Sequence, residues 1–245
     1  MLAGVAPLGA QQPPFSAPPP FPAADSTPGA PGTIRWYHAA AVLAGTSLLF
    51  LADSPVERFA QNHRSSTTDG AASFFRHFGQ PEVYGTVSLG LVATGLLAKN
   101  SRLTRTGLRA TFSVGLAGAS TLALKGLFGR ERPDAADGTV DFDPFGHSQG
   151  LPSGHTSLAF ALATSLSDDI HRPWATVGLY TLATGTALSR INDNRHWLSD
   201  VALGAVVGIT SAKLASGRWQ IFGIRTPSFL ATPTGGAGVG WHATF

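Results

Sequence analysis

The 245-residue sequence contains no cysteine and one methionine, and only 13% of its residues are charged. The lack of cysteine excludes disulfides, thiol nucleophiles and cysteine-based metal sites, although it fits both an envelope and a cytosolic compartment. The formal net charge of +3 comes without a basic run interleaved with aromatic residues. We therefore expect no nucleic-acid partner.

Long apolar runs are also lacking. The longest helical runs free of Asp, Glu, Lys and Arg are Trp36–Ala52 and Pro173–Ser189, each of 17 residues. A membrane-spanning helix needs about 20 residues, and about 17 is the lower limit. The mean hydropathy is only +0.12. These values fit either a membrane bundle rich in small residues or a compact soluble bundle.

Six apolar stretches rich in small residues predict an all-α bundle of about six helices, at residues 37–52, 83–98, 108–124, 156–167, 174–189 and 198–215. Between the first two, Ser54–Gln80 predicts one or two short amphipathic helices. Three regions are expected: a Pro/Ala-rich disordered segment at 1–34, a helical domain at 35–217 and a Pro/Gly-rich tail at 218–245. Within the first, Leu2–Ala10 is similar to the end of a secretory signal but lacks its basic start.

Basic side chains and imidazoles are concentrated in three short segments of this charge-poor chain. Lys125 precedes Arg132-Pro133 by a spacer of six residues, and Arg190 follows Ser189. Arginine forks match phosphate oxygens, and lysine adds a point charge. These cations predict a site that stabilises the charge of a transferring phosphoryl group.

The segment Pro152-Ser153-Gly154-His155 precedes a predicted helix. Ser153 is expected to cap that helix, and Gly154 would let the backbone approach an anion. Free N–H groups and the helix dipole favour phosphate at this position.

His196 and Asp200 lie four positions apart, and so share one face of a helix. A carboxylate on one ring nitrogen fixes the tautomer and leaves the other nitrogen as a nucleophile. His155 would then protonate the leaving group. Taken singly, each motif is more often a solvated cation, a surface ion pair or a simple helix cap. Their joint occurrence favours the phosphate site.

Together, Lys125-x6-Arg132-Pro133, Pro152-Ser153-Gly154-His155 and Ser189-Arg190-x5-His196-x3-Asp200 resemble the signature of the type-2 phosphatidic acid phosphatase and vanadium haloperoxidase superfamily, in its lipid-phosphatase-like branch. The resemblance spans about residues 36–217. It implies a helical bundle with the active site formed by loops at one end. It also implies His196 as phosphohistidine nucleophile, Asp200 as its orienting carboxylate and His155 as acid. The implied phosphate-binding set is Lys125, Arg132, Ser153, Gly154 and Arg190.

The resemblance predicts a metal-independent phosphatase acting on a phosphomonoester or pyrophosphate, of a lipid, an isoprenoid or a small molecule. No cofactor is expected, although vanadate would bind the same pocket as an inhibitor. The alternatives are a vanadate-dependent haloperoxidase, a soluble non-specific acid phosphatase and an inactive helical scaffold. Oligomeric state is left open.

Position in the cell is predicted from charge. If six helices span a membrane from a cytoplasmic N-terminus, all three motifs lie on the outer side. The positive-inside tendency agrees with this for Lys99, Arg102, Arg105, Arg109, Lys213 and Arg218, and disagrees for Arg58, Arg64 and Arg76. We therefore expect an envelope protein with an outward-facing site, or a soluble exported bundle.

One long loop, Asp134–Gly150, joins the first two motifs and carries four aspartates and His147. A metal site is conceivable there, but its spacing matches no known cation loop. A solvated lid over the pocket is the favoured interpretation.

Overall fold

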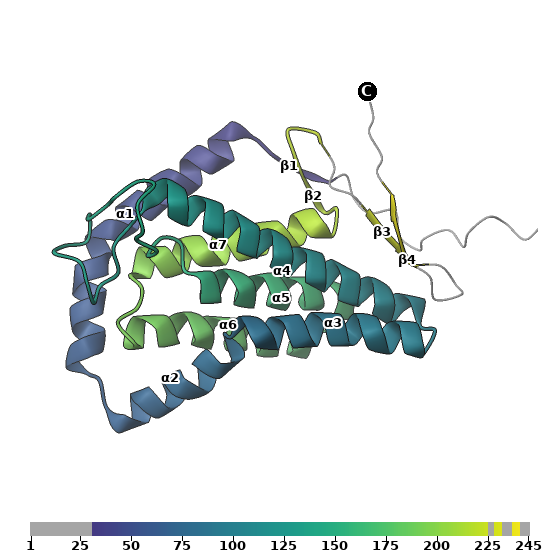
Figure 1. The fold of residues 1–245 in the computed structure, drawn as a ribbon, viewed down its shortest axis with the longest axis horizontal. Helices are drawn as coiled ribbons and strands as arrows, with labels where there is room; N and C mark the ends of the chain where they lie inside the picture. Colours follow the sequence, from purple (N-terminus) through teal and green to yellow (C-terminus); the bar gives the residue numbers. More distant parts are fainter. Residues whose placement is uncertain (1–30, 225–227, 232–236, 241–245) are drawn as a thin grey trace, which may run out of the picture. The chain divides into compact units, whose positions relative to one another are not determined.

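The computed structural model describes residues 31–224, 228–231 and 237–240. Within these residues the chain forms seven α-helices and two small sheets (Figure 1). The helices are α1 (Trp36–Asn62), α2 (Ser66–Phe78), α3 (Pro81–Leu97), α4 (Ser101–Phe128), α5 (Gly154–Ile170), α6 (Pro173–Asn192) and α7 (Leu198–Ala215). The strands are β1 (Gly32–Ile34), β2 (Trp219–Ile221), β3 (Ser228–Ala231) and β4 (Ala237–Gly240). The predicted disordered segment, its signal-like start included, lies outside the described residues up to position 30.

All six predicted apolar stretches are helical, so the all-α prediction is confirmed. The prediction for Ser54–Gln80 was wrong at its start, because α1 continues past Pro55 to Asn62 before α2 begins. An interior proline lacks a backbone donor and crowds the preceding turn, but α1 is helical on both sides of Pro55. Both strands of the first sheet lie outside the predicted helical domain at 35–217: β1 runs parallel to β2, with Gly32 opposite Trp219.

Glycine and asparagine set the limits of α4. The Asn100 side chain accepts a hydrogen bond from the Leu103 amide at 3.0 Å and caps the start of the helix. The end is Gly129, which has a left-handed φ of 58°. A Cβ there would lie 1.7 Å from the Asp143 carbonyl oxygen, so only glycine fits. This sharp end directs the following residues back over the start of α5.

The centre of the bundle is α5, which packs against α4, α6 and α7. Small side chains dominate the main core cluster, which is formed by Tyr84, Ala110, Ala159, Leu162, Ala163 and Ala183. The closest helix contact is between α5 and α7. An ideal Cβ on Gly204 would lie 2.8 Å from the Ser153 carbonyl oxygen, and one on Gly208 would lie 2.3 Å from that of Ser157.

Gly208→Ala is expected to destabilise the fold by about 1–3 kcal/mol, because the added methyl forces α5 and α7 apart. Thermal unfolding in detergent measures the effect. The matched control is Gly115→Ala in α4, where a Cβ meets nothing within 4 Å. That control should be neutral or stabilising by up to about 1 kcal/mol. Equal Tm values for the two variants would contradict the close-packing interpretation.

At the C-terminal end of α5, ion pairs connect three helices. Lys213 of α7 contacts Asp168 at 2.8 Å, and Arg109 of α4 contacts Asp169 at 2.9 Å. These ion pairs lie at the opposite end of α5 from the second motif, which is at its N-terminal end.

Three of the described helices, α1, α4 and α7, are long and apolar enough to cross a membrane. Many large apolar side chains of α1 are exposed, among them Leu43, Leu48 and Leu51. Such exposure is costly in water and favourable in lipid. These features indicate association with a membrane.

Candidate active site

The structure brings the predicted residues of all three motifs to the N-terminal end of α5. Lys125 lies in the last turn of α4, Arg132 in the loop that follows it, and Arg190 in the last turn of α6. The His155 ring, at the start of α5, is within electrostatic range of these three cations and of His196. An ideal Cβ on Gly154 would lie 4.0 Å from Lys125 Cε, so these two residues are neighbours.

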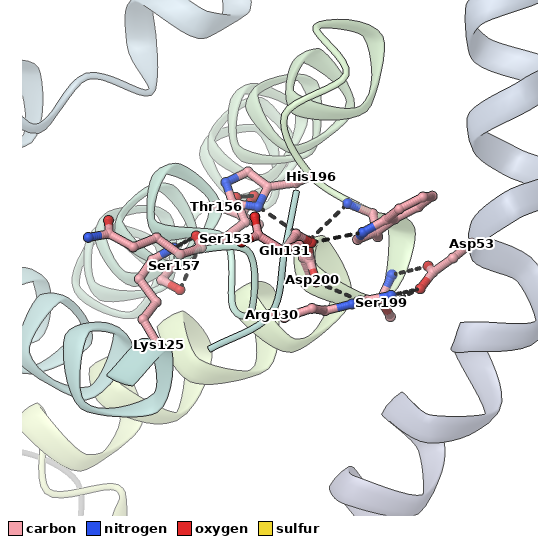
Figure 2. Close-up of polar contacts among 12 residues, drawn as sticks. Asp53, Lys125, Arg130, Glu131, Ser153, Thr156, Ser157, His196, Ser199 and Asp200 are labelled. Atoms are coloured by element: carbon pink, nitrogen blue, oxygen red, sulfur yellow. Dashed lines mark hydrogen bonds and ion pairs between the residues drawn. The ribbon is translucent and has the colours of Figure 1, made fainter. Parts of the chain in front are cut away.

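The predicted His196–Asp200 pair is formed and buried (Figure 2). His196 Nδ1 lies 3.4 Å from Asp200 Oδ2, which also accepts the Trp197 amide hydrogen at 2.9 Å. Asp200 is in the first turn of α7, and His196 lies just before that helix. The contact occupies Nδ1 and leaves Nε2 as the ring nitrogen available for attack.

Burial keeps His196 neutral. It lowers the pKa of His196 to about 4, with the charges of Lys125 and Arg190 acting in the same direction. The hydrogen bond and charge of Asp200 oppose the shift and raise that pKa. At neutral pH the imidazole therefore retains the lone pair that a nucleophile needs.

Two arginines present unused donors to the site. Among the residues that the structure describes, Arg132 Nε and Arg190 Nε are buried without a hydrogen-bond partner. Buried donors normally have a hydrogen-bond acceptor, and an oxyanion bound here would supply one to both Nε groups. Arg190 Nη1 donates to Asp193 Oδ2 at 3.1 Å, and Arg76 Nη1 of α2 donates to the same oxygen at 2.8 Å. The Lys125 ammonium donates to the Gln149 carbonyl.

Ser153 holds the N-cap position of α5, as predicted, but its side chain makes no capping hydrogen bond. Its hydroxyl instead accepts a hydrogen bond from Thr156 Oγ1 at 3.0 Å, and its amide donates to the Asp200 carbonyl at 2.9 Å. The second bond joins the start of α5 directly to the first turn of α7. The first-turn amides of α5 thus keep no side-chain cap, as an anion-binding helix end requires.

Sequence reasoning missed Arg130 and Asp53, which are both fully buried behind Asp200. Arg130 Nη1 contacts Asp200 Oδ1 at 2.7 Å, and Arg130 Nη2 contacts Asp53 Oδ2 at 2.7 Å (Figure 2). Ser199 bridges them: its amide donates to Asp53 Oδ1 at 2.8 Å, and its hydroxyl to Asp53 Oδ2 at 2.6 Å. The only sequence signal for Asp53 is its position as the first charge after the uncharged run Trp36–Ala52.

The predicted loop between α4 and α5 is present, and one ion pair and one backbone hydrogen bond help to fix its course. Asp134 pairs with Arg195 at 2.6 Å, and the Asp141 carbonyl accepts the Glu131 amide at 3.0 Å. Within the described part of the chain, no three His, Asp or Glu side chains gather as a metal site would. The role of this loop as a lid over the pocket stays a prediction.

Comparisons with known proteins agree with this arrangement. Residues 106–221 match the family model of the PAP2 superfamily. Lipid A 1-phosphatase of Porphyromonas gingivalis is 45% identical over 106 residues, which are 42% of this chain and 21% of that protein. The chain thus matches about a fifth of the length of this curated relative.

Two crystal structures share the fold. LpxE of Aquifex aeolicus superposes with a TM-score of 0.53 at 22% identity, covering 67% of this chain and 94% of that one. A transmembrane PAP2-type phosphatidylglycerolphosphate phosphatase of Bacillus subtilis gives 0.58 at 20% identity, covering 74% and 95%. At these identities the likeness concerns the fold alone. The family match over residues 106–221 and the three motifs gathered at one end of the bundle both agree with the resemblance to the PAP2 superfamily.

Proposed function

We propose that this protein is a metal-independent phosphatase that hydrolyses a phosphomonoester or pyrophosphate of a lipid through a phosphohistidine intermediate. The observation that carries the proposal is the buried His196–Asp200 pair in electrostatic range of Lys125 and Arg190. The partnerless Nε donors of Arg132 and Arg190 add two groups suited to a phosphate. The similarity to lipid A 1-phosphatase and the membrane-compatible helices support a lipid substrate.

In the first step, His196 Nε2 attacks phosphorus while the bond to the leaving oxygen breaks. His155 donates a proton to that oxygen. Burial and the charges of Arg190, Lys125 and Arg132 lower the pKa of His155 to about 4, so it carries this proton only when the anionic phosphate offsets those charges. Arg132, Arg190 and Lys125 stabilise the charge that spreads over the equatorial oxygens. Asp200 stabilises the positive charge that develops on the His196 ring.

In the second step, water attacks the phosphohistidine. His155 takes a proton from that water, the N–P bond breaks, and inorganic phosphate leaves with His196 restored. The residues that fit phosphate also fit vanadate, because the two oxyanions share shape and charge. Bromide oxidation with added vanadate and peroxide would reveal the haloperoxidase alternative. Preference for soluble phosphomonoesters over lipids would reveal the acid-phosphatase alternative.

The decisive experiment is a phosphate-release screen of the purified protein in EDTA, with and without detergent. Its substrates are phosphatidate, phosphatidylglycerophosphate, undecaprenyl pyrophosphate, lipid A and p-nitrophenyl phosphate. We expect release from at least one lipid phosphate at full rate in EDTA. Loss of release in EDTA, with recovery on adding a divalent cation, would refute the metal-independent mechanism.

The acidic limb of the kcat/KM profile is expected to have its midpoint near pH 4. The folded pKa of His196 lies below its ordinary value, so protonation, and with it loss of the nucleophile, occurs only as pH falls toward about 4. Asp200→Asn removes an interaction that raises this pKa, so the midpoint of its residual activity should shift lower. A steady-state pH series with p-nitrophenyl phosphate measures both. A wild-type midpoint at or above the ordinary histidine value of about 6.5 would contradict the assignment.

We further propose that the site faces outward from the cell, because the opposite end of the bundle carries Lys99, Lys213 and Arg109. The absence of native cysteine makes single-cysteine labelling unambiguous. In intact cells, or in spheroplasts where an outer membrane exists, Asp137→Cys in the site loop should react with a membrane-impermeant maleimide. Lys99→Cys, between α3 and α4, should react only after lysis. The reverse pattern would place the site in the cytoplasm.

A further inference from the structure

A buried ion-pair network joins three separate parts of the chain behind the candidate nucleophile. Arg130 belongs to the loop after α4, Asp53 to α1, and Asp200 to α7. All three side chains are 0% exposed. The guanidinium also lies 4.5 Å from the ring centroid of Phe50 and 5.5 Å from that of Trp197. Aromatic rings and carboxylates thus fix the plane of Arg130.

The two carboxylate oxygens of Asp200 have different partners. Oδ1 is held by Arg130 at 2.7 Å, while Oδ2 faces His196 Nδ1 and the Trp197 amide. A carboxylate with one oxygen fixed in this way cannot rotate about its Cβ–Cγ bond without losing the ion pair. The orientation of the imidazole therefore depends on Arg130, although Arg130 does not contact His196.

Asp53 is the counterpart that keeps Arg130 in place. The second guanidinium nitrogen binds Asp53, and Ser199 adds two further hydrogen bonds to that carboxylate. Asp53 is one of only two buried residues of α1, the other being Thr46. A buried charge is costly unless it is paired, so its presence in an otherwise exposed apolar helix requires an explanation.

We propose that Asp53 and Arg130 are positioning residues, which act through Asp200 to hold His196 in its attacking orientation. This inference rests on the proposed phosphohistidine mechanism. Misplacement of a reacting group by about 1 Å can cost about 100-fold in rate. The phosphate donors Lys125, Arg132 and Arg190 are not part of the network, so substrate binding should be spared.

The test separates positioning from stability by comparing single and double substitutions. Arg130→Met leaves the buried carboxylates of Asp53 and Asp200 without their shared cation and should lower Tm strongly, whereas Asp53→Asn keeps the Arg130–Asp200 ion pair and should lower Tm less. The double variant Asp53→Asn/Arg130→Met also removes the Asp53 charge and should recover part of the Tm that Arg130→Met loses, because Asp200 is then the one buried charge left of the three. We expect its kcat to stay at least about tenfold below wild type, with KM and inhibition by vanadate nearly unchanged. If kcat recovers together with Tm, the network is only structural and the proposal is wrong.

The matched control is Arg109→Met/Asp169→Asn, which removes an ion pair from the other end of α5. It should alter Tm without altering kcat. Ser199→Ala provides a milder variant in case the double substitution does not fold. It removes the hydroxyl between Asp53 and Arg130 and should lower kcat by about fivefold at constant KM. Unchanged kcat in a folded Ser199→Ala protein would also count against the proposal. Turnover by a His196→Ala variant would instead refute the underlying mechanism, so the two failures are distinguishable.

Discussion

His196→Ala should lower kcat by at least about four orders of magnitude while leaving the protein folded. The substitution removes the atom that forms the bond to phosphorus, and no other imidazole in the described structure forms such a pair with a carboxylate: His155 instead lies within electrostatic range of three cations. Replacing a buried imidazole by alanine leaves the neighbouring ion pairs of Asp200 with Arg130 intact. Phosphate release and thermal unfolding, measured on the same preparation, check both parts.

The control for this variant is His63→Ala, because His63 is an exposed imidazole at the end of α1. It should retain wild-type kcat. Acid-quenched samples of the wild type should contain a labelled protein species after mixing with 32P-labelled substrate, and His196→Ala should not. Turnover by His196→Ala near the wild-type rate would exclude the covalent mechanism.

His155→Ala is expected to affect substrates according to their leaving group. An alkoxide leaves poorly without a proton, so release from lysophosphatidate should fall by about 10²–10⁴. p-Nitrophenolate leaves without protonation, so hydrolysis of p-nitrophenyl phosphate should fall much less. The measurement is the ratio of the two kcat/KM values for each protein, because kcat/KM reports phosphoryl transfer to His196 and not the later hydrolysis, in which His155 acts as a base for both substrates.

This comparison contains its own control, because both substrates meet the same cations in the same protein. A defect in folding or in phosphate binding would lower both rates equally. Equal losses for the two substrates would therefore show that His155 binds or positions the phosphate rather than donating a proton.

The sequence predicted the parts of the site that depend on local spacing. His196 and Asp200 are four positions apart and do meet, but the prediction that they share one helix face was wrong, because His196 lies just before α7. The anion-binding end of α5 follows from Gly154 and the apolar helix behind it. The positions of the helices followed from composition, because apolar runs of this length, rich in Ala and Leu, are longer than typical strands.

The network behind the site could not be predicted in this way. Asp53 and Arg130 are 77 positions apart, and their contact depends on which helix crosses which end of the bundle. Periodicity identifies the apolar face of a helix but not its partner. The continuation of α1 to Asn62 was missed because the apolar run ends at Ala52, while the helix includes the charged residues that follow it.

The two glycines of α7 that approach α5 have a consequence for the surroundings of the molecule. In a bilayer the lipid tails are as apolar as leucine, so helices associate through close backbone contact and not through release of water. Gly204 and Gly208, spaced four apart, allow such contact with Ser153 and Ser157. The contact between α5 and α7, the helices that carry His155 and Asp200, is therefore favourable in detergent and in lipid alike. Transfer from detergent to lipid should leave the catalytic geometry unchanged.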